Sequence, residues 1–358
     1  MRKTPDFGYL CVFIVPALLP AAAWLTRWGV APAWAAWFPM LFLFGAVPLA
    51  DWLLGPSRQN PQEAEVSTLE QSRIYRWLTW LVLPVWLGLL AWVTHYWTST
   101  PMSLSAQIGW LVSTGIIGGV LAINTAHELI HKDGRLEPAF GGVLLASVCY
   151  AGFKVEHLRG HHVHVSTPQD TSSARYGEIV YGFVPRAMVR NFRNAWGLEA
   201  KRLKQRGLPV LHWRNELLIW YSLSLLFALA AGWAWGWQAG AFFVMQGVIA
   251  GATLEIINYI EHYGLHRREI GEGRYERVDH RHSWNSNYRL TNWMLFQLQR
   301  HADHHANARR RYQVLRHFDD SPQLPAGYAT MFVVALMPPL WKRVIDPRVR
   351  RHLAEHLN

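Results

Sequence analysis

Histidine is the residue type of this chain best suited to chemistry, and it falls in four clusters. The chain has 18 His but only 2 Cys. Neutral imidazole is a good ligand for iron, copper, nickel and zinc. Four patterned clusters therefore predict a metal centre, where a single cluster would be weak evidence. The clusters read HELIHK (127–132), EHLRGHH (156–162), NYIEHYGLHR (258–267) and LQRHADHH (298–305).

The spacing within the clusters suits metal binding. Histidines at i and i+4 of a helix share one face. We therefore expect His127 with His131, and His157 with His161, each to present two nitrogens to one metal. Nine candidate ligands result, which is too many for one ion and suits two. They are His127, His131, His157, His161, His162, His262, His301, His304 and His305.

Other interpretations of these histidines are weaker. HELIH matches the H-E-x-x-H motif of zinc peptidases, in which Glu128 would be the general base. A peptidase needs one further ligand, whereas seven more patterned histidines follow here. Whether His164 and His266, which lie just outside the motifs, also bind metal stays open at this stage.

Carboxylates accompany the clusters. Metal-bound imidazoles usually donate their outer N–H to a carboxylate or a carbonyl, and five residues are predicted to accept such bonds: Glu128, Glu156, Asp170, Glu261 and Asp303. Glu255 falls inside the last apolar segment, where an ionisable group is costly and indicates function. It could orient a ligand or bind the metal itself.

The elements that must position these residues are membrane helices. The chain is 51% hydrophobic, and a bilayer span needs about 20 mostly apolar residues. The predicted fold class is an all-α integral membrane protein in which six transmembrane helices carry a cytosolic, histidine-rich cap. We expect one unit, residues 1–358, without separate domains. The six predicted spans are 7–29, 33–54, 75–97, 105–126, 214–236 and 238–260.

The basic residues predict the orientation. Connectors 98–104 and 233–240 carry no Lys or Arg, whereas 127–213 holds 12 and 264–358 holds 16. Lys and Arg stay on the cytoplasmic side, so both termini and all four clusters are expected there. The net charge of +11 suits contact with anionic membrane lipid or docking of an acidic soluble partner. Nucleic acid is not expected, because no binding motif accompanies the charge.

The two cysteines exclude a fused iron–sulfur or rubredoxin-like module. Cys11 and Cys149 have no C-x-x-C neighbour, and an iron–sulfur module needs four cysteine thiolates. Any electron donor is therefore expected to be a separate protein.

At this point the motifs show a resemblance. HELIHK, EHLRGHH followed by TPQD, NYIEHYGL and LQRHADHH resemble the integral-membrane non-haem diiron alkane 1-monooxygenases (alkane ω-hydroxylases), from about Asn124 to Arg310. The resemblance implies that the nine histidines hold two iron ions. It further implies a multi-pass enzyme of the bacterial inner (cytoplasmic) membrane. That enzyme would convert medium- to long-chain n-alkanes to primary alcohols with O2. Rubredoxin, reduced by an NAD(P)H-dependent rubredoxin reductase, would supply the electrons.

Related activities remain alternatives. An alkyl-aromatic methyl hydroxylase or a fatty-acyl desaturase would share much of this pattern. A metal transporter is disfavoured, since transporters place polar groups near the bilayer midplane and these histidines lie at helix ends. Aromatic residues of the second span could plug a substrate channel, but aromatic residues there are more often packing or interface anchors. They are Trp37, Phe38, Phe42, Phe44 and Trp52.

Overall fold

Six long apolar helices form the body of the protein in the computed structural model, which describes residues 6–356. Each is long enough to cross a bilayer, which confirms the predicted all-α membrane fold. Three of the six are built from consecutive segments. The spans are η1 (Phe7–Phe13) with α1 (Ile14–Arg27); α2 (Pro32–Leu41), η2 (Phe42–Ala46) and α3 (Val47–Leu54); α5 (Arg73–Ser99); α6 (Leu104–Ile117), η3 (Gly118–Ile123) and α7 (Asn124–Ile130); α12 (Glu216–Trp235); and α13 (Trp237–His262).

The fourth and sixth spans extend further than their apolar runs. The apolar residues end at 126 and 260, but the helices continue to Ile130 and His262. The first and third histidine clusters therefore begin within the last turns of membrane helices. The hydrogen bonds of a helix do not stop at the first polar residue when no proline or glycine follows.

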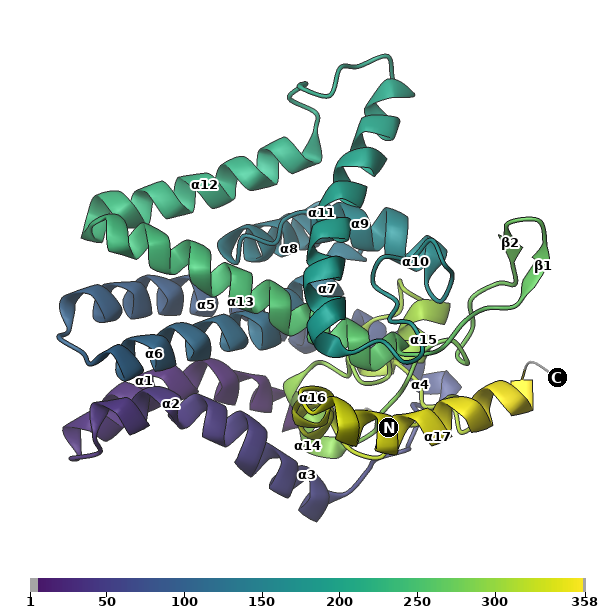
Figure 1. The fold of residues 1–358 in the computed structure, drawn as a ribbon, viewed down its shortest axis with the longest axis horizontal. Helices are drawn as coiled ribbons and strands as arrows, with labels where there is room; N and C mark the ends of the chain where they lie inside the picture. Colours follow the sequence, from purple (N-terminus) through teal and green to yellow (C-terminus); the bar gives the residue numbers. More distant parts are fainter. Residues whose placement is uncertain (1–5, 357–358) are drawn as a thin grey trace.

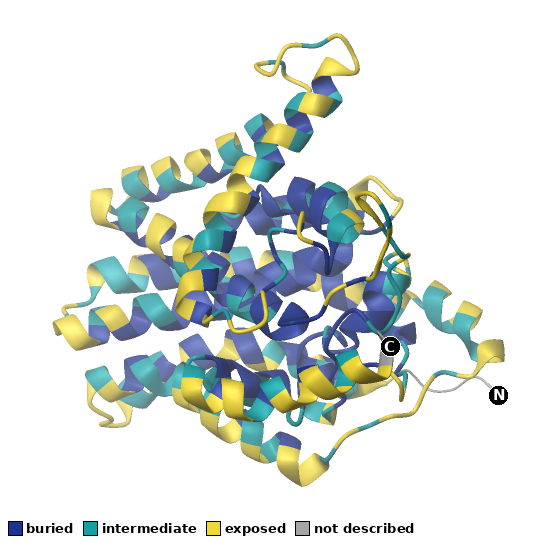
Figure 2. Cartoon of the chain, turned by 45° about the vertical axis from the view of Figure 1, so that its right-hand side comes forward, coloured by how far each residue is buried: buried dark blue, intermediate teal, exposed yellow. Residues whose placement is uncertain are grey.

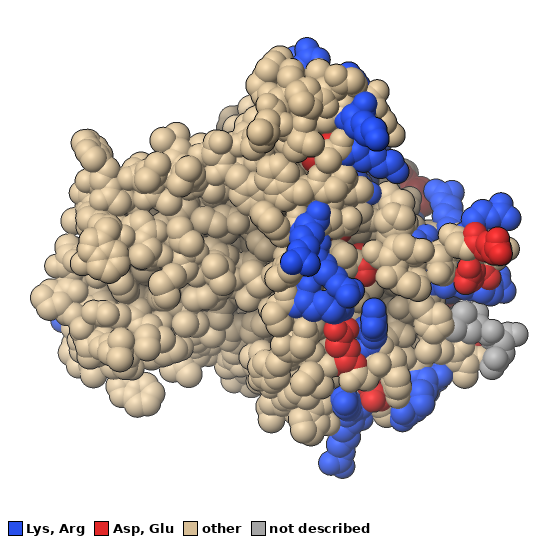
Figure 3. Space-filling model, turned by 45° about the horizontal axis from the view of Figure 1, so that its top comes forward, with Lys and Arg blue, Asp and Glu red and all other residues tan. Residues whose placement is uncertain are grey.

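Charge divides the molecule into two halves. Nearly all Lys, Arg, Asp and Glu visible in Figure 3 gather on one side, and the other half is almost uniformly uncharged. The uncharged half holds the six spans, which lie roughly side by side in Figure 1. This division is what a bilayer around the spans requires.

The helix α11 (Val180–Lys204) crosses the ends of the spans (Figure 1). It carries basic side chains and follows the second histidine cluster in the sequence. Its buried residues, such as Phe183 and Ala195, face the bundle. Tyr181, Val189 and Phe192 are exposed outward, beside basic side chains. An amphipathic helix of this kind suits the plane of a membrane interface.

Short elements complete the charged half and enclose the histidines. Buried residues are densest where these elements meet the spans (Figure 2). The segments are α4 (Glu63–Gln71), α8 (Leu136–Ser147), α9 (Phe153–Glu156), η4 (His157–His161), α10 (His162–His164), β1 (Glu269–Gly271), β2 (Arg274–Tyr275), α14 (Arg289–Met294), α15 (His301–Ala306), η5 (Tyr312–Val314), α16 (Tyr328–Ala335) and α17 (Pro338–His356). The two strands pair antiparallel as an isolated hairpin.

Candidate metal centre

All nine predicted histidines meet where the spans end, in two groups. Within each group the candidate ligand atoms lie within 4.8 Å of one another. His164 and His266 belong to neither group. The first group, called here the five-histidine group, contains His127, His131, His157, His162 and His304. The second, the four-histidine group, contains His161, His262, His301 and His305.

The ring nitrogens converge inside each group. Two nitrogens about 2.1 Å from one ion and at right angles to each other are about 3.0 Å apart. In the five-histidine group the Nε2–Nε2 distances are 3.0 Å for His131–His157, 3.0 Å for His157–His162 and 3.2 Å for His162–His304. In the four-histidine group they are 3.2 Å for His161–His305, 2.9 Å for His301–His305 and 3.2 Å for His262–His301.

Hydrogen bonding between the rings does not explain this convergence. The Nε2 atom of His157 contacts the Nε2 atoms of both His131 and His162. A ring nitrogen either donates one proton or offers one lone pair, and cannot serve two such neighbours. The Nε2 atom of His127 is buried and has no hydrogen-bond partner among the described residues. A cation in each group would satisfy these nitrogens, so the residues fit the metal that the sequence predicts.

The second cluster divides differently from the prediction. His157 shares a group with His162, whereas His161 belongs to the other group. The segment η4 is a π-helical turn, and the His162 backbone N–H donates to the His157 carbonyl five residues earlier. Such a turn is wider than an α-helical one. It brings i+5 back beside i and directs i+4 to the opposite group, so the expected His157–His161 pair was wrong.

The other clusters follow α-helical spacing. His127 and His131 share the five-histidine group, as their i, i+4 spacing predicts. On α15, His301 and His305 join the four-histidine group, and His304 faces the five-histidine group. Adjacent helical residues point about 100° apart. The helix α15 therefore lies between the two groups and supplies both.

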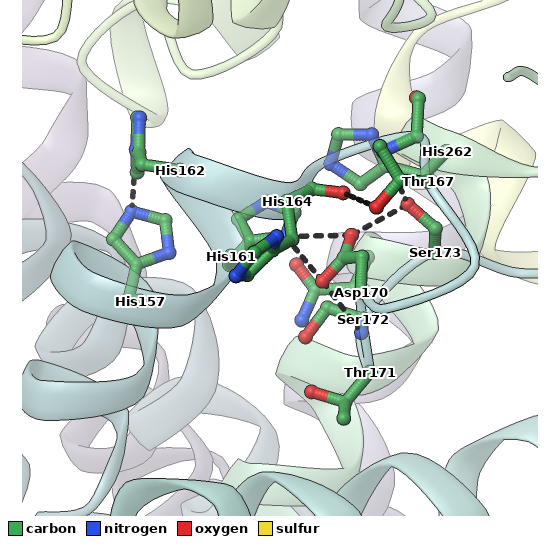
Figure 4. Close-up of polar contacts among 12 residues, drawn as sticks. His157, His161, His162, His164, Thr167, Asp170, Thr171, Ser172, Ser173 and His262 are labelled. Carbon is green, nitrogen blue, oxygen red and sulfur yellow. Dashed lines mark hydrogen bonds and ion pairs between the residues drawn. The ribbon is translucent and has the colours of Figure 1, made fainter. Parts of the chain in front are cut away.

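Asp170 holds the outer nitrogen of His161. Its carboxylate oxygens lie 3.0 and 3.1 Å from Nδ1 of His161 (Figure 4). Ser173 Oγ and the Ser172 backbone N–H donate to the same carboxylate, at 2.6 and 3.1 Å. Burial would raise the pKa of Asp170, but the neighbouring His161 lowers it to about 2. An ionised Asp170 keeps the proton on Nδ1 and leaves Nε2 available for a metal.

Glu261 takes a different position from the one expected. Its Oε2 lies 3.2 Å from Nε2 of His301, the nitrogen that faces the group, and not beside the outer Nδ1. The Tyr328 hydroxyl donates to Oε1 at 2.9 Å. The carboxylate of Glu261 thus lies on the metal-facing side of His301.

Among residues 6–356, three of the predicted carboxylates form no hydrogen bond or ion pair with a histidine. Glu128 pairs with Lys132 at 2.8 Å. Glu156 accepts from Thr171 and Asn194, and Asp303 pairs with Arg310 at 2.6 Å. Each carboxylate was predicted to accept a histidine N–H because it lies beside a histidine in the sequence. Neighbours on a helix diverge by about 100°, so nearness in sequence did not give contact.

Glu255 belongs to neither group and sits in a buried polar network that sequence reasoning missed. Its side chain accepts from Tyr150, from Asn191 at 2.9 Å and from Asn258 at 3.1 Å. Asn191 also donates to Ser172 Oγ at 3.0 Å, beside Asp170. The only sequence signal for Asn191 is a polar residue on the inner face of α11. Through it, a carboxylate within the sixth span is tied to the loop that orients His161.

An apolar cavity ends at the histidines. It encloses about 80 Å³ and touches both groups, through His127 and His157 on one side and His301 on the other. Its apolar wall includes Val120, Leu254 and Phe332. The cavity thus connects the membrane bundle to both candidate metal positions.

Of the five aromatic residues predicted to plug a channel, Phe44 lines this cavity and stacks on Phe332 at 4.7 Å between ring centroids. The other four are not part of its wall. Trp52 is 73% exposed on the outer surface. Trp37 lies against Gly109 of the fourth span, and Phe38 against Phe42. Helical periodicity turns most side chains of the second span away from the cavity, so these four have the packing or surface positions that are the commoner role of such residues.

Burial favours the neutral form of most of these histidines. Burial, together with neighbouring histidines, moves the pKa well below its ordinary value in six of them: His131, His157, His162, His301, His304 and His305. In His161 burial has the same effect, but Asp170 outweighs it and raises the pKa. Neutral imidazole is the form that binds metal.

Comparisons with known proteins agree with this geometry. Residues 103–335 match the family described as fatty acid desaturase. The chain is 52% identical to alkane 1-monooxygenase 2 of Pseudomonas aeruginosa, covering 99% of this chain and 94% of the relative. It is 52% identical to alkane 1-monooxygenase 2 of Alcanivorax borkumensis, covering 100% and 94%. A more distant relative, at 26% identity over 76% and 73%, is the xylene/toluene monooxygenase hydroxylase component of Pseudomonas putida.

Proposed function

The chain belongs to the alkane 1-monooxygenases, within the wider fatty acid desaturase family, and we propose that it hydroxylates the terminal methyl group of medium- to long-chain n-alkanes with two irons, O2 and electrons from reduced rubredoxin. The reaction consumes one alkane, one O2, two electrons and two protons, and gives one primary alcohol and one water. When bound, the two irons would supply the oxidising chemistry that no amino-acid side chain can provide.

One observation carries the proposal. An apolar cavity ends at two separate groups of converging imidazole nitrogens. Two ions are proposed because no single coordination sphere accommodates nine nitrogens, and iron because neutral imidazole ligands suit it.

The chain's own residues would bind and orient the substrate. An alkane offers no polar handle, so selection must come from the shape of the cavity. Val120, Leu254 and the stacked pair Phe44–Phe332 would contact the alkyl chain and keep water away from the histidines. One additional methylene changes binding by only about 1–3 kcal/mol, so a narrow wall at Phe44 would limit chain length more sharply than apolar contact alone.

The charged half is proposed to face the cytoplasm of a bacterium, with the spans in the inner membrane and the whole chain acting as one unit. The distribution of Lys and Arg supports this orientation. Rubredoxin, reduced by an NAD(P)H-dependent reductase, would dock on this basic face. Electrostatic steering of an acidic partner would raise the association rate.

Metal analysis combined with product chemistry tests the proposal. We expect two irons per purified chain and 1-alkanol from n-alkane with reduced rubredoxin. His→Ala changes at His131 and at His305, one from each group, should each lower the iron content and abolish turnover. His95 and His212 lie in neither group. The matched controls, His95→Ala and His212→Ala, should keep both the iron content and the turnover.

Three results would count against the proposal. One zinc per chain would exclude the diiron assignment. Oxidation of an alkyl-aromatic methyl group without turnover of n-alkanes would favour the activity named for the more distant relative. Formation of a double bond in a fatty-acyl chain would favour a desaturase.

A further inference from the structure

A second cavity lies beside the first, between α11, α12 and α13. It encloses about 230 Å³. Figure 1 shows α11 crossing α13, with α12 alongside. Part of its wall is the turn after α8, including Cys149 and Tyr150, and part is Met188 and Phe192 of α11. Nothing in the proposed reaction so far uses this space.

Phe153 is the partition between the two cavities. Its side chain lines both. The ring stacks on His157 of the five-histidine group at 4.5 Å between centroids and on Tyr150 at 6.3 Å. Rotation of one aromatic side chain would therefore join the second cavity to the end of the first, where the reaction takes place.

A polar bridge runs parallel to this partition. Asn258 lines the first cavity and donates to Glu255 at 3.1 Å. Asn191 and Tyr150 line the second cavity and donate to the same carboxylate. Glu255 is completely buried within a membrane span, where a carboxylate is costly and indicates function. The passage between the cavities thus has polar groups along one side.

The second cavity is amphiphilic from its inner end to its mouth. Tyr221 reaches the inner end because Gly152 has no side chain, and a Cβ there would lie 2.6 Å from its hydroxyl. That hydroxyl accepts from the Gly152 backbone N–H at 3.2 Å. Its own proton meets no acceptor among residues 6–356, so it can donate to a ligand. At the mouth, Phe192 and Val248 are 50% and 53% exposed on the outer surface.

We propose that this second cavity binds the primary alcohol product, with its hydroxyl on Tyr221 and its alkyl chain directed past Met188 and Phe192 toward the lipid. The inference rests on the proposed function, since it takes the product of that reaction as the ligand. Phe153 would be the partition that moves as the product leaves.

The chemistry favours an alcohol over the other apolar occupants. An alkane would gain nothing from Tyr221, and burying its unpaired hydroxyl proton against an alkane would cost free energy. An alcohol can accept a hydrogen bond from the Tyr221 hydroxyl. In the first cavity the new hydroxyl would have to retreat along an apolar wall, whereas Asn258 and Tyr221 offer it partners along the way.

Cys149 provides a native reporter for occupancy. It lines the second cavity, and the only other cysteine of the chain is Cys11 in the first span. Burial raises the pKa of the Cys149 thiol to about 11, so its alkylation is slow enough to follow. In a Cys11→Ser variant, the rate of Cys149 modification by N-ethylmaleimide is measured by mass spectrometry, with 1-dodecanol or n-dodecane added.

We expect 1-dodecanol to protect Cys149 and n-dodecane not to. At ten times its Kd the alcohol would leave about one site in eleven empty, so modification should slow about tenfold. Tyr221→Phe should weaken the alcohol's apparent affinity about three- to tenfold, the usual effect of losing one hydrogen bond. Tyr181→Phe, whose hydroxyl donates to the Leu336 carbonyl away from this cavity, is the control.

Equal protection by dodecane would overturn the proposal and identify an alkane entrance. Protection in lipid nanodiscs without added alcohol, lost in detergent, would identify a lipid acyl chain and overturn it too. So would unchanged affinity in Tyr221→Phe. These measurements need no turnover, so failure of alkane hydroxylation would appear separately, in the product assay of the iron-loaded enzyme.

Discussion

Asp170 and His161 form the one carboxylate–imidazole contact at an outer ring nitrogen of the nine histidines within the described part of the chain, with 3.0 Å between Oδ2 and Nδ1. Asp170→Asn keeps the shape but removes the charge that holds the Nδ1 proton. We expect it to weaken metal binding in the four-histidine group about 10- to 100-fold, as losses of such partners do. Iron content after dialysis against a chelator measures this. Asp133→Asn, at an exposed carboxylate, is the control, and equal retention in both variants would refute the role.

Asn191 should stabilise the site without touching a metal. Asn191→Leu leaves Glu255 short of one of its three donors and separates it from the Ser172–Asp170 loop. A buried group deprived of a partner costs about 1–3 kcal/mol, so the melting temperature of the metal-free protein should fall. Asn194→Leu, which loses only a 3.2 Å bond to Glu156, should have a smaller effect. An identical shift in the two would contradict the network.

Rubredoxin docking should depend on Arg309 and not on its neighbours. Its side chain is 83% exposed and pairs only loosely, at 3.7 Å, with the exposed Asp133, whereas Arg310 pairs with Asp303 and Arg311 with Glu137 in less exposed positions. Arg309→Glu should raise the rubredoxin concentration at half-maximal turnover, and salt should erase the difference because exposed charges are screened over about 8 Å at physiological ionic strength. Arg27→Glu, at the opposite end of the spans, is the control. A salt-independent effect would contradict docking.

The metal-free protein should lose stability as the pH falls below about 6.5, the ordinary pKa of histidine. Six of the histidines have a lowered pKa in the fold. The unfolded chain therefore binds more protons than the folded one below that pH. Each extra proton costs about 1.4 kcal/mol per pH unit. Thermal unfolding between pH 8 and 5.5 measures this, and His304→Asn should flatten the slope. Stability that rises toward pH 5.5 would contradict it.

Phe44 should set the longest alkane accepted. Phe44→Ala opens the wall at the position where Phe44 stacks on Phe332 and should shift the preference toward longer alkanes. Phe44→Trp should shift the preference toward shorter alkanes. The ratio of kcat/KM for two chain lengths should change about tenfold or more, since one methylene is worth about 1–3 kcal/mol. Trp52→Phe, on the outer surface, should leave the ratio unchanged. The same profile in all three variants would remove Phe44 from the channel.

The sequence alone predicted what depends on local patterns. The lengths of the apolar runs predicted six membrane spans, and the spacing of His127 and His131 predicted that both lie on one face of a helix. It could not predict contacts made between distant segments, such as Asn191 with Glu255 or Tyr328 with Glu261. Neither could it place Phe44 on a cavity wall that also includes residues of the fourth and sixth spans and α16.

The π-helical turn η4 has a consequence for how this site tolerates insertion and deletion. In η4 the π-helical turn places His162, at i+5, beside His157 and directs His161 to the other group. On α15 an α-helical turn does the same with one residue fewer, because His305 at i+4 shares the group of His301 and His304 at i+3 faces the other. Removing Leu158 would shorten the second cluster to the H-x-x-H-H spacing of α15, and an α-helical turn would then keep the two histidines in opposite groups. Relatives whose second cluster is one residue shorter can therefore hold the same two groups.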